Sequence, residues 1–461
     1  MSTAAVGSGT VHVIGAGLAG LAAALSLSGP GTSGGRRVVV HEAGPLAGGR
    51  CRSWFDRALG VTIDNGNHLL LSGNEAALGY IERIGALDTF ERPQEAAIPF
   101  VDIATGERWT VRPGRGRVPW WVLRAGRRVP GTRACDYLAA LRLRRAMPDE
   151  TVASVLGRDL GRDTVLFRRL WQPLAVAALN TAAEDASARL FWHVLRETLG
   201  RGAAACRPML ARSGLSESLV EPALAFLARR GGAFRSGCRL RALDVAAGRV
   251  AGLMFDGDTV ALAPGDSVIL AVPAAIAARL VPGLTVPDDY APIVNAHFRC
   301  DRGAIAPPGT AWFVGVTGGV AEWVFRKREV ISVTVSAADR IVDRPADALR
   351  EALWQDVSLA CRLPPGPPPP CRIIKERRAT FRATPAQLAR RPATATGWPN
   401  LHLAGDYVDT GLPATIEGAI RSGLAAAARV RQRRAVPALN PGPLPQPHAS
   451  SRIGDCQRAL P

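Results

Sequence analysis

The hydrophobic pattern of the chain begins with a short apolar run, Val11 to Ile14, which is long enough for one buried parallel strand. Three glycines follow in G-x-G-x-x-G spacing: Gly15, Gly17 and Gly20. An Ala/Leu-rich run with helical character comes next, and a second apolar run, residues 37–41, ends at Glu42. This order of apolar runs and glycines predicts a strand–helix–strand unit with a parallel strand pair.

The remaining apolar pattern falls into blocks. Residues 151–230 show mainly helical patterns, with few charges that would face inward. Three short strands separated by glycine-rich turns predict a β-meander at 239–245, 249–255 and 259–262, and a buried strand follows at 266–273. A second strand-rich block covers 291–300, 312–316, 321–326 and 330–336. Near the end, a strand at 401–404 leads into a glycine–proline turn and a helix from about Ala414.

Each of the three early glycines is explained by a different physical requirement. Gly15 permits the tight turn, Gly17 lets a pyrophosphate approach the backbone, and Gly20 lets the helix pack close to the strand. The helix N-terminus presents unpaired N–H groups to phosphates. Glu42 lies roughly twenty residues further on, where such folds place an acid on the ribose hydroxyls. The apolar strand, the glycine spacing and the acid at Glu42 together predict a dinucleotide-binding site. They argue against a strand–helix–strand unit that binds no ligand.

Three other polar motifs are candidates for chemistry. The Gly48-Gly49-Arg50 turn offers amides and a guanidinium to a second phosphate, unless it is an ordinary surface turn. Residues 63–68 place an acid and a histidine before an apolar run; the segment is either a capped turn or a group aimed at the cofactor ring. In the C-terminal motif, Asp406 suits a polyol or ribityl-phosphate chain, and the following helix N-terminus suits an electron-rich group.

Composition narrows the class of protein. The net charge is +18 and the pI is about 10.9, but the arginine excess is spread through an Ala/Arg/Gly/Pro-rich chain without a nucleic-acid-binding module. Attraction to an anionic membrane surface explains this basic, fairly apolar composition better than nucleic-acid binding does. The eight cysteines form no C-x-x-C pair, which predicts neither a metal site nor a disulfide framework. The first strand begins too early for a signal peptide, and the most apolar run, 268–278, is too short to span a bilayer.

The segment 112–133 combines tryptophans with arginines. Val118 to Leu123 is apolar and contains Trp120 and Trp121, and seven arginines surround it: Arg112, Arg115, Arg117, Arg124, Arg127, Arg128 and Arg133. This pattern fits a membrane-docking segment, because tryptophan rings prefer the headgroup level and cations face anionic lipid. A core hairpin with solvated arginines explains it equally well. Residues 136–147 predict an amphipathic helix.

Taken together, the motifs VIGAGLAGLAAA, GGR at 48–50 and AGD with GLPATIEGA at 404–419 resemble the FAD-dependent amine oxidase and carotenoid desaturase superfamily. The resemblance covers residues 10–430. Within that superfamily, the segments 63–71, 171–180 and 412–419 look most like the hydroxysqualene dehydroxylase family, also known as squalene-associated FAD-dependent desaturases. One departure is Asn67, where glutamine is more usual in that turn.

The resemblance implies an α/β fold in which a Rossmann-like FAD-binding domain, with its parallel sheet and β-meander, is interleaved with an α+β substrate domain. The FAD domain is expected at 9–90, 215–285 and 396–435, the substrate domain at 91–214 and 286–395, and a disordered tail at 436–461. The residues expected to bind FAD are Gly15, Ala16, Gly17, Leu18, Ala19, Gly20, Glu42, Gly49, Arg50, Leu240, Gly405, Asp406 and Ile416. Leu240 would touch the adenine through its backbone, and the Ile416 amide would lie near the flavin carbonyl.

The resemblance also implies a reaction, the reductive loss of the hydroxyl of hydroxysqualene to give squalene for hopanoid supply. A general acid must protonate the departing hydroxyl. The candidates are the ionisable residues His68, Asp64 and Asp409. The alternatives are a carotenoid-type desaturase or isomerase and a non-catalytic prenyl-lipid carrier on the same fold. We expect no nucleic-acid partner. The protein is expected to cooperate with upstream squalene-pathway synthases. We expect it in the cytoplasm, bound peripherally to the inner face of the cell membrane.

Overall fold

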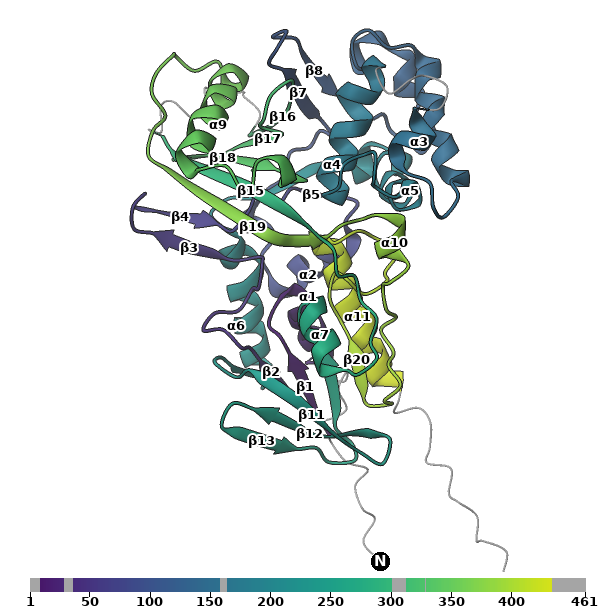
Figure 1. Cartoon of the computed structure of the whole chain (residues 1–461), viewed down its shortest axis with the longest axis vertical. Helices are drawn as coiled ribbons and strands as arrows, with labels where there is room; N and C mark the ends of the chain where they lie inside the picture. The colour runs from purple at the N-terminus through teal and green to yellow at the C-terminus, as the bar shows by residue number, and fades with distance from the viewer. Residues whose placement is uncertain (1–8, 29–35, 158–163, 301–311, 328, 433–461) are drawn as a thin grey trace, which may run out of the picture.

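The computed structural model describes residues 9–28, 36–157, 164–300, 312–327 and 329–432. Two large sheets organise the molecule, a parallel sheet in the lower half of Figure 1 and a mixed sheet in the upper half. The predicted α/β fold class is confirmed. The predicted disordered tail, residues 436–461, lies outside the described residues.

The parallel sheet is built by segments that lie far apart in the sequence. Its strand order is β10-β2-β1-β14-β20. The bounds are β1 Thr10–Ile14, β2 Arg37–His41, β10 Ala233–Arg235, β14 Ser267–Leu270 and β20 Leu401–Leu403. All of these strands fall inside the segments expected to form the FAD domain, whose exact boundaries stay a prediction.

The parallel sheet is covered on both faces, which explains its continuous apolar runs. Val11 and Val13 pack with helices α1 (Leu18–Leu27) and α11 (Ile416–Gln432). Val268 and Leu270 share a core with the meander on the other face. The meander has the three predicted strands, with bounds β11 Leu240–Ala246, β12 Arg249–Phe255 and β13 Asp258–Ala261.

Helices α1 and α11 cross closely because small residues lie at their contact. A Cβ added at Gly423 of α11 would lie 2.1 Å from the Ala19 carbonyl oxygen of α1. Every residue of α1 is buried, so this helix is sandwiched between the sheet and α11. The C-terminal motif is thereby held against the N-terminal glycine turn.

The second sheet has seven strands in the order β19-β15-β18-β17-β16-β7-β8. Their bounds are β7 Ile98–Asp102, β8 Arg108–Val111, β15 Tyr290–Arg299, β16 Phe313–Thr317, β17 Trp323–Lys327, β18 Val330–Val335 and β19 Cys371–Phe381. Helix α9 (Ala346–Cys361) covers one face, with Leu349 and Leu353 fully buried. The predicted block of four strands is confirmed to within two residues, whereas β7, β8 and β19 carry no strand prediction.

Helices gather over the other face of this sheet and around the parallel sheet. The α-helices are α2 Glu75–Ile84, α3 Val152–Leu156, α4 Gln172–Leu179, α5 Ala188–Glu197, α6 Glu221–Arg229, α7 Ala274–Leu280 and α10 Pro385–Leu388. Short strands are β3 Ser53–Asp56, β4 Val61–Asp64, β5 Leu70–Leu71, β6 Phe90–Glu91 and β9 Pro208–Ala211. The π-helical turns η5 Phe167–Trp171 and η8 Ser216–Val220 lead into α4 and α6.

The helix predicted at 136–147 has a different form. The chain makes 3₁₀ turns at η2 Trp120–Leu123, η3 Ala125–Arg127 and η4 Ala134–Arg145. A 3₁₀ helix has three residues per turn, so side chains three apart lie above one another. Leu138 and Leu141 therefore share one ridge, and both are exposed. A helix is therefore present where the amphipathic pattern predicts one, in the form of 3₁₀ turns over Ala134–Arg145.

Candidate flavin site

The turn between β1 and α1 has the shape of a pyrophosphate cradle. Gly15 has a φ of +105° and donates its N–H to the His41 carbonyl at 2.7 Å, which ties the turn to the end of β2. A Cβ at Gly20 would lie 2.0 Å from the Gly15 carbonyl oxygen. A Cβ at Gly17 would meet no protein atom within 4 Å, so it would project into the cradle instead. The structure thus gives these glycines the geometry expected from the sequence.

Glu42 is held against this turn by backbone amides. Its Oε2 accepts the Ala16 N–H at 2.8 Å, and its Oε1 accepts the Gly44 N–H at 2.9 Å. A carboxylate has further lone pairs, so Glu42 can still accept bonds from a ribose diol. The Cys238 N–H donates to the Glu42 carbonyl at 2.8 Å, which brings Leu240 at the start of β11 close to β2.

The 48–50 turn packs directly on the glycine turn. The Gly48 N–H donates to the Ala16 carbonyl at 2.8 Å, and Gly17 and Gly48 form a parallel bridge. Gly49 has a φ of +58°, and a Cβ there would lie 3.5 Å from the Gly17 Cα. The two segments predicted to contact phosphate are therefore neighbours, with Leu18 and Ala19 buried in the first turn of α1 behind them.

Arg50 connects this turn to the C-terminal motif. Its Nη2 lies 2.7 Å from Asp406 Oδ1, and its Nη1 donates to the Ala379 carbonyl at 2.6 Å. The Arg50 side chain is 46% exposed and the Asp406 side chain 12% exposed. The Asp406 carboxylate raises the pKa of Arg50. Two predicted cofactor residues from opposite ends of the chain thus share one salt bridge.

The loop after β20 is held by Arg391, which the sequence analysis missed because no local motif marks it. The Arg391 side chain is buried and donates to main-chain carbonyls of the loop, at 2.7 Å for Leu412 and 2.5 Å for Val408. Gly405 has a φ of +147° and donates its N–H to Ser422 Oγ at 2.8 Å. The loop that presents Asp406 and leads to Ile416, the first residue of α11, is therefore rigidly supported.

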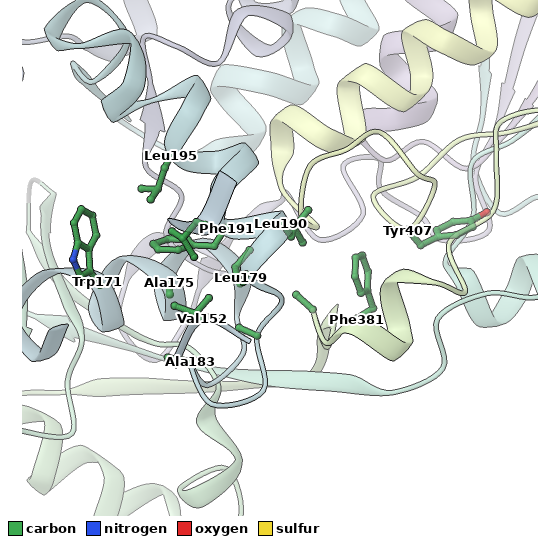
Figure 2. Packing of buried hydrophobic residues seen from close by; sticks show 14 of the residues in the cluster. Val152, Trp171, Ala175, Leu179, Ala183, Leu190, Phe191, Leu195, Phe381 and Tyr407 are labelled. Carbon is green, nitrogen blue, oxygen red and sulfur yellow. The ribbon is translucent and has the colours of Figure 1, made fainter. Parts of the chain in front are cut away.

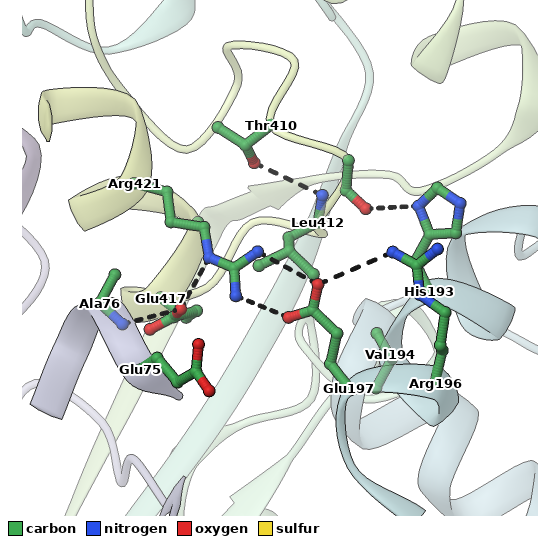
Figure 3. A network of polar contacts seen from close by, with 12 residues as sticks. Glu75, Ala76, His193, Val194, Arg196, Glu197, Thr410, Leu412, Glu417 and Arg421 are labelled. Carbon is green, nitrogen blue, oxygen red and sulfur yellow. Dashed lines mark hydrogen bonds and ion pairs between the residues drawn. The ribbon is translucent and has the colours of Figure 1, made fainter. Parts of the chain in front are cut away.

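A polar network docks helix α5 onto the same loop (Figure 3). His193 Nδ1 lies 2.8 Å from the Gly411 carbonyl oxygen. The Arg421 guanidinium binds Glu197 of α5 at 2.6 Å and Glu417 of α11 at 2.7 Å. Glu417 is buried and also accepts N–H groups at the start of α2. The network holds helix α5 against the C-terminal motif.

The three candidate proton donors occupy different environments. Asp64 is buried, and its Oδ2 lies 2.7 Å from Lys327 Nζ. Its Oδ1 accepts from Ser53 Oγ at 2.6 Å and from the Leu215 N–H at 2.9 Å. Burial favours the neutral acid, but Lys327 and these hydrogen bonds outweigh it and hold the pKa of Asp64 below its usual value. An ionised, fully partnered carboxylate suits an anchor between β4 and β17 better than a proton donor.

His68 lies in the turn between β4 and β5. Burial lowers its pKa to about 4, against the opposing effect of Asp64. The neighbouring Asn67 donates through Nδ2 to Thr334 Oγ1 of β18 at 3.1 Å, and that hydroxyl donates to Asn295 Oδ1 at 2.8 Å. The turn is thus fastened to the second sheet, and His68 is neutral at pH 7.

Asp409 is the most exposed of the three candidates, with 63% of its side chain accessible. Its Oδ1 accepts the Gly411 N–H at 3.1 Å and lies 3.8 Å from Arg391 Nη1. The three candidates thus differ in burial and in their partners, and their catalytic role stays a prediction.

An apolar layer extends from this region into the helices (Figure 2). Trp171, Leu179 and Phe191 are buried in one cluster with Phe381. Beside the layer, a cavity of about 680 Å³ lies between α4 and strands β16 and β17. Its lining combines apolar residues, such as Val176, Val316 and Trp323, with the charged residues Asp102, Glu107, Arg168, Arg169 and Glu322. The segment 171–180 thus contributes both to the core and to a cavity wall.

The residues present fit a flavin dinucleotide. The Gly17 cradle offers α1 amides to a diphosphate, Glu42 offers acceptors to a diol, and the Arg50–Asp406 pair offers both a donor and an acceptor nearby. Within the described ranges, no group of three or more His, Cys, Asp or Glu side chains is arranged to hold a metal ion.

Comparison with known proteins identifies the family. A family model described as flavin containing amine oxidoreductase matches residues 18–431. The chain belongs to this family. The cofactor of the site just described is therefore a flavin.

Curated relatives define the family more closely. A hydroxysqualene dehydroxylase from Rhodopseudomonas palustris is 48% identical over 423 residues, which cover 91% of this chain and 97% of the relative. The one from Zymomonas mobilis is 44% identical over 416 residues, covering 90% and 97%. The chain belongs to the hydroxysqualene dehydroxylase family. A protein named probable zeta-carotene desaturase from Synechococcus elongatus is only 24% identical over 505 residues, covering 93% and 100%.

Solved structures confirm the predicted fold. A triple mutant of putrescine oxidase matches with a TM-score of 0.68 and 17% identity, covering 92% of this chain and 99% of that one. Cyclohexylamine oxidase from Brevibacterium oxydans matches with a TM-score of 0.64 and 16% identity, covering 93% and 100%. At this level of identity, the likeness concerns the fold alone.

Proposed function

We propose that this protein is an FAD-dependent oxidoreductase that reduces hydroxysqualene to squalene. The observation that carries the proposal is the 44–48% identity, over about nine tenths of the chain, to relatives named hydroxysqualene dehydroxylase. The glycine cradle, Glu42 and the Arg50–Asp406 pair support FAD as the flavin.

The chemistry requires loss of an allylic hydroxyl from an oily chain. FAD, when reduced, supplies the hydride. In this proposal, residues 15–20, Glu42, Arg50 and Asp406 hold the dinucleotide, and apolar side chains of the cluster formed by α4, α5 and β17 border the substrate. A dry lining matters because water would capture an allylic cation before it is reduced. Orientation of the substrate in such a site supplies much of the rate.

The observations weigh against the two alternatives. A carotenoid-type desaturase would share the fold and the flavin, but its representative is only half as similar to this chain as the hydroxysqualene dehydroxylases are. A prenyl-lipid carrier predicts a degraded dinucleotide site. Instead, Gly15, Gly20 and Glu42 keep the contacts that such a site needs.

We further propose that residues 112–147 dock the protein on the anionic cytoplasmic face of the cell membrane, where substrate from upstream squalene-pathway synthases would partition. In the described part of the chain, six of the eleven large hydrophobic side chains that are exposed fall within this segment: Val118, Trp120, Leu123, Leu138, Leu141 and Met147. Exposed arginines surround them: Arg112, Arg115, Arg117, Arg124, Arg133, Arg142, Arg144 and Arg145. Apolar side chains inside a ring of cations suit an interfacial membrane contact.

The two tryptophans of this segment differ. Trp120 is 69% exposed, whereas Trp121 is 6% exposed and packs edge-on against Tyr137 with ring centroids 5.5 Å apart. Trp121 is thus a core residue, and of the two tryptophans only Trp120 is exposed enough to face a membrane. None of the described helices is long and apolar enough to cross a bilayer, so the proposed contact is peripheral.

The function is tested anaerobically with purified protein, chemically reduced FAD and hydroxysqualene in detergent, with products identified by gas chromatography–mass spectrometry. We expect squalene to form in step with flavin reoxidation. Oxidation of phytoene-like polyenes without squalene formation would instead assign the protein to the desaturases. A purified protein that binds no flavin would favour the carrier.

A further inference from the structure

A smaller cavity, of about 260 Å³, lies between the parallel sheet and the meander, and residues of β1, β2, β10 and β13 contribute to its lining. Elsewhere this face of the sheet is apolar, with Ile14, Val268 and Leu270 buried in the core shared with the meander. Along the cavity the face instead carries two histidines and two arginines: His12, His41, Arg37 and Arg235. Polar groups on an otherwise apolar sheet face are costly to bury unless they have a polar partner.

The two histidines form one hydrogen-bonded pair. His12 Nδ1 lies 3.2 Å from His41 Nε2, and both side chains are buried. The His41 ring also stacks on Phe255 of the meander, with ring centroids 4.8 Å apart. The second ring nitrogen of His41, Nδ1, is buried and has no hydrogen-bond partner in the described part of the chain. The pair therefore contains one unsatisfied buried nitrogen.

This unsatisfied nitrogen determines the tautomer of both rings. Burial lowers the pKa of both histidines, and a neutral imidazole carries a single N–H. Because a buried N–H without an acceptor is rarer than an acceptor without a donor, His41 carries its proton on Nε2 and donates it to His12 Nδ1. His12 then carries its own proton on Nε2. That nitrogen makes no hydrogen bond to a described residue and, unlike His41 Nδ1, is not buried from solvent, so its N–H is available to a molecule in the cavity.

Two arginines bring positive charge to the same cavity. Arg37 begins β2, and Arg235 pairs with His41 near the other end of that strand. His12 pairs with Val39, midway between these two positions. Both arginines add to the effect of burial in lowering the pKa of His12, so both act at this ring. Both are exposed, and neither forms an ion pair with another residue of the described ranges.

Carboxylates near the cavity do not cancel this charge. Asp266 lines the cavity, but its two oxygens already accept the N–H groups of Thr10 at 2.5 Å and Ala263 at 2.8 Å. Asp258 of β13 is exposed, so water and salt screen its effect. The lining therefore combines two guanidinium groups and one imidazole N–H with a single, fully partnered carboxylate.

We propose that this cavity binds a phosphate-type oxyanion, held between the guanidinium groups of Arg37 and Arg235 and the Nε2–H of His12. The planar fork of a guanidinium group matches the oxygens of a phosphate, and such charge-assisted bonds are stronger than bonds between neutral groups. The cavity volume of about 260 Å³ corresponds to roughly nine water molecules, which leaves room for a tetrahedral oxyanion and its remaining hydration.

The proposed oxyanion site is separate from the flavin cradle. The cradle follows the carboxyl end of β1, whereas the cavity lies on the sheet face, against Val260 and Ala261 of β13. Strand β2 connects the two sites, because the His41 carbonyl accepts the N–H of Gly15 at 2.7 Å. An oxyanion can therefore bind while the flavin is in place, and the proposal does not depend on which substrate the flavin reduces.

The test is calorimetric titration of the flavin-loaded protein with inorganic phosphate in a chloride buffer, so that FAD occupies the cradle. We expect one phosphate site. Replacement of both Arg37 and Arg235 by Gln should raise the Kd for phosphate by about tenfold or more, because two charge-assisted bonds are lost. Flavin absorbance and thermal unfolding verify that the variant is folded, which is expected because both arginines are exposed.

The matched control replaces Arg83 and Arg92 by Gln. Both are exposed, and neither lines the cavity, so this variant loses the same charge without losing a ligand. Its Kd for phosphate should stay within about twofold of wild type. A parallel titration with glycerol phosphate identifies the source of the oxyanion, because tighter binding than inorganic phosphate assigns the site to a phosphate ester and weaker binding assigns it to the free ion.

A second measurement tests the role of His12 directly. Two-bond proton–nitrogen NMR spectra of protein labelled with ¹⁵N-histidine should show His12 with its proton on Nε2, and that resonance should shift when phosphate is added. The spectrum of His12→Gln assigns the signal. Absence of binding at millimolar phosphate, equal losses of affinity in the two double variants, or a His12 with its proton on Nδ1 would each overturn the proposal.

Discussion

Arg50 Nη2 and Asp406 Oδ1 lie 2.7 Å apart, although 356 positions separate these residues in the chain. The pair joins the turn after β2 to the loop after β20, on either side of the glycine cradle. Because both groups are charged and Asp406 is largely buried, the bond is stronger than one between neutral groups. The pair thus determines how the two halves of the flavin site meet.

Replacement of Asp406 should therefore weaken FAD binding. We expect Asp406→Asn to raise the Kd for FAD by roughly tenfold to a hundredfold, equivalent to about 1.4–2.8 kcal/mol. Titration of apoprotein with FAD, followed by fluorescence quenching, measures the change. Asp343→Asn is the control, because it breaks an exposed pair with Arg377 away from the site and should leave the Kd unchanged. An unaltered Kd in Asp406→Asn would remove this residue from the cofactor site.

The Gly17 cradle makes a prediction that separates folding from binding. Because a Cβ at Gly17 meets no protein atom and its φ is −72°, Gly17→Val should fold with little loss of stability. The side chain would occupy the cradle, so we expect purified Gly17→Val to carry no yellow flavin. Gly79→Val, at an equally open position of α2, should keep its flavin. Thermal unfolding of both apoproteins verifies folding, and a flavin-loaded Gly17→Val would contradict this placement of the diphosphate.

The buried Asp64–Lys327 pair makes a prediction about stability. Lys327→Met should lower the free energy of unfolding by about 3–5 kcal/mol, because it leaves the buried Asp64 carboxylate without its cation. Arg377→Met, in the exposed pair with Asp343, should cost about 0–1 kcal/mol. Urea denaturation measures both. In the wild type, the depressed pKa of Asp64 contributes stability that is complete above about pH 3.9 and is lost as the pH falls toward the folded value.

Three histidines predict how stability depends on pH. Burial lowers the pKa of His41, His68 and His297 to about 4, and a neighbouring His12 adds to the effect at His41. Between about pH 6.5 and 4 the unfolded chain binds protons that the folded chain does not, so stability should fall as the pH falls through this range. Each histidine adds up to about 1.4 kcal/mol per pH unit to the slope. His297→Gln should flatten the curve measured by urea denaturation; an identical slope would contradict the burial of an uncharged His297.

Substitution of Trp120 should affect membrane binding, whereas substitution of the neighbouring Trp121 should affect stability. Trp120→Ser combined with Leu138→Ser should reduce co-sedimentation with anionic liposomes by several-fold while leaving the thermal unfolding temperature nearly unchanged, because both side chains are exposed. Trp121→Ala should instead cost about 3–5 kcal/mol of stability. Met254→Ser, on the exposed surface of the meander, is the control for liposome binding. Liposome binding that survives the double substitution and is insensitive to salt would argue against the proposed membrane contact.

Much of the fold was predictable because its signals are local. The spacing of Gly15, Gly17 and Gly20 after an apolar strand has one geometric solution, and the strand patterns at 291–336 repeat with the period of a sheet. The helix predicted at 136–147 is present at 134–145, but its 3₁₀ form was not predictable, since a short amphipathic pattern does not distinguish a period of 3.0 from one of 3.6. Strand β19 was missed because five of its eleven residues are lysine, arginine or glutamate, which hides any alternation of apolar and polar residues. Its hydrogen-bonded pairing with β15 holds it in the sheet, and that pairing is not visible in the local sequence.

The sequence by itself determined the dinucleotide-binding unit, the C-terminal Gly-Asp motif and the family, because each depends on residues that are close along the chain. Only the tertiary structure decided that Lys327 neutralises Asp64 and that Arg391 supports the loop of Asp406. It likewise separated Trp120 from Trp121. The physical reason is that ionisation and burial depend on which distant side chains the fold brings within a few ångströms, and no local pattern encodes that distance.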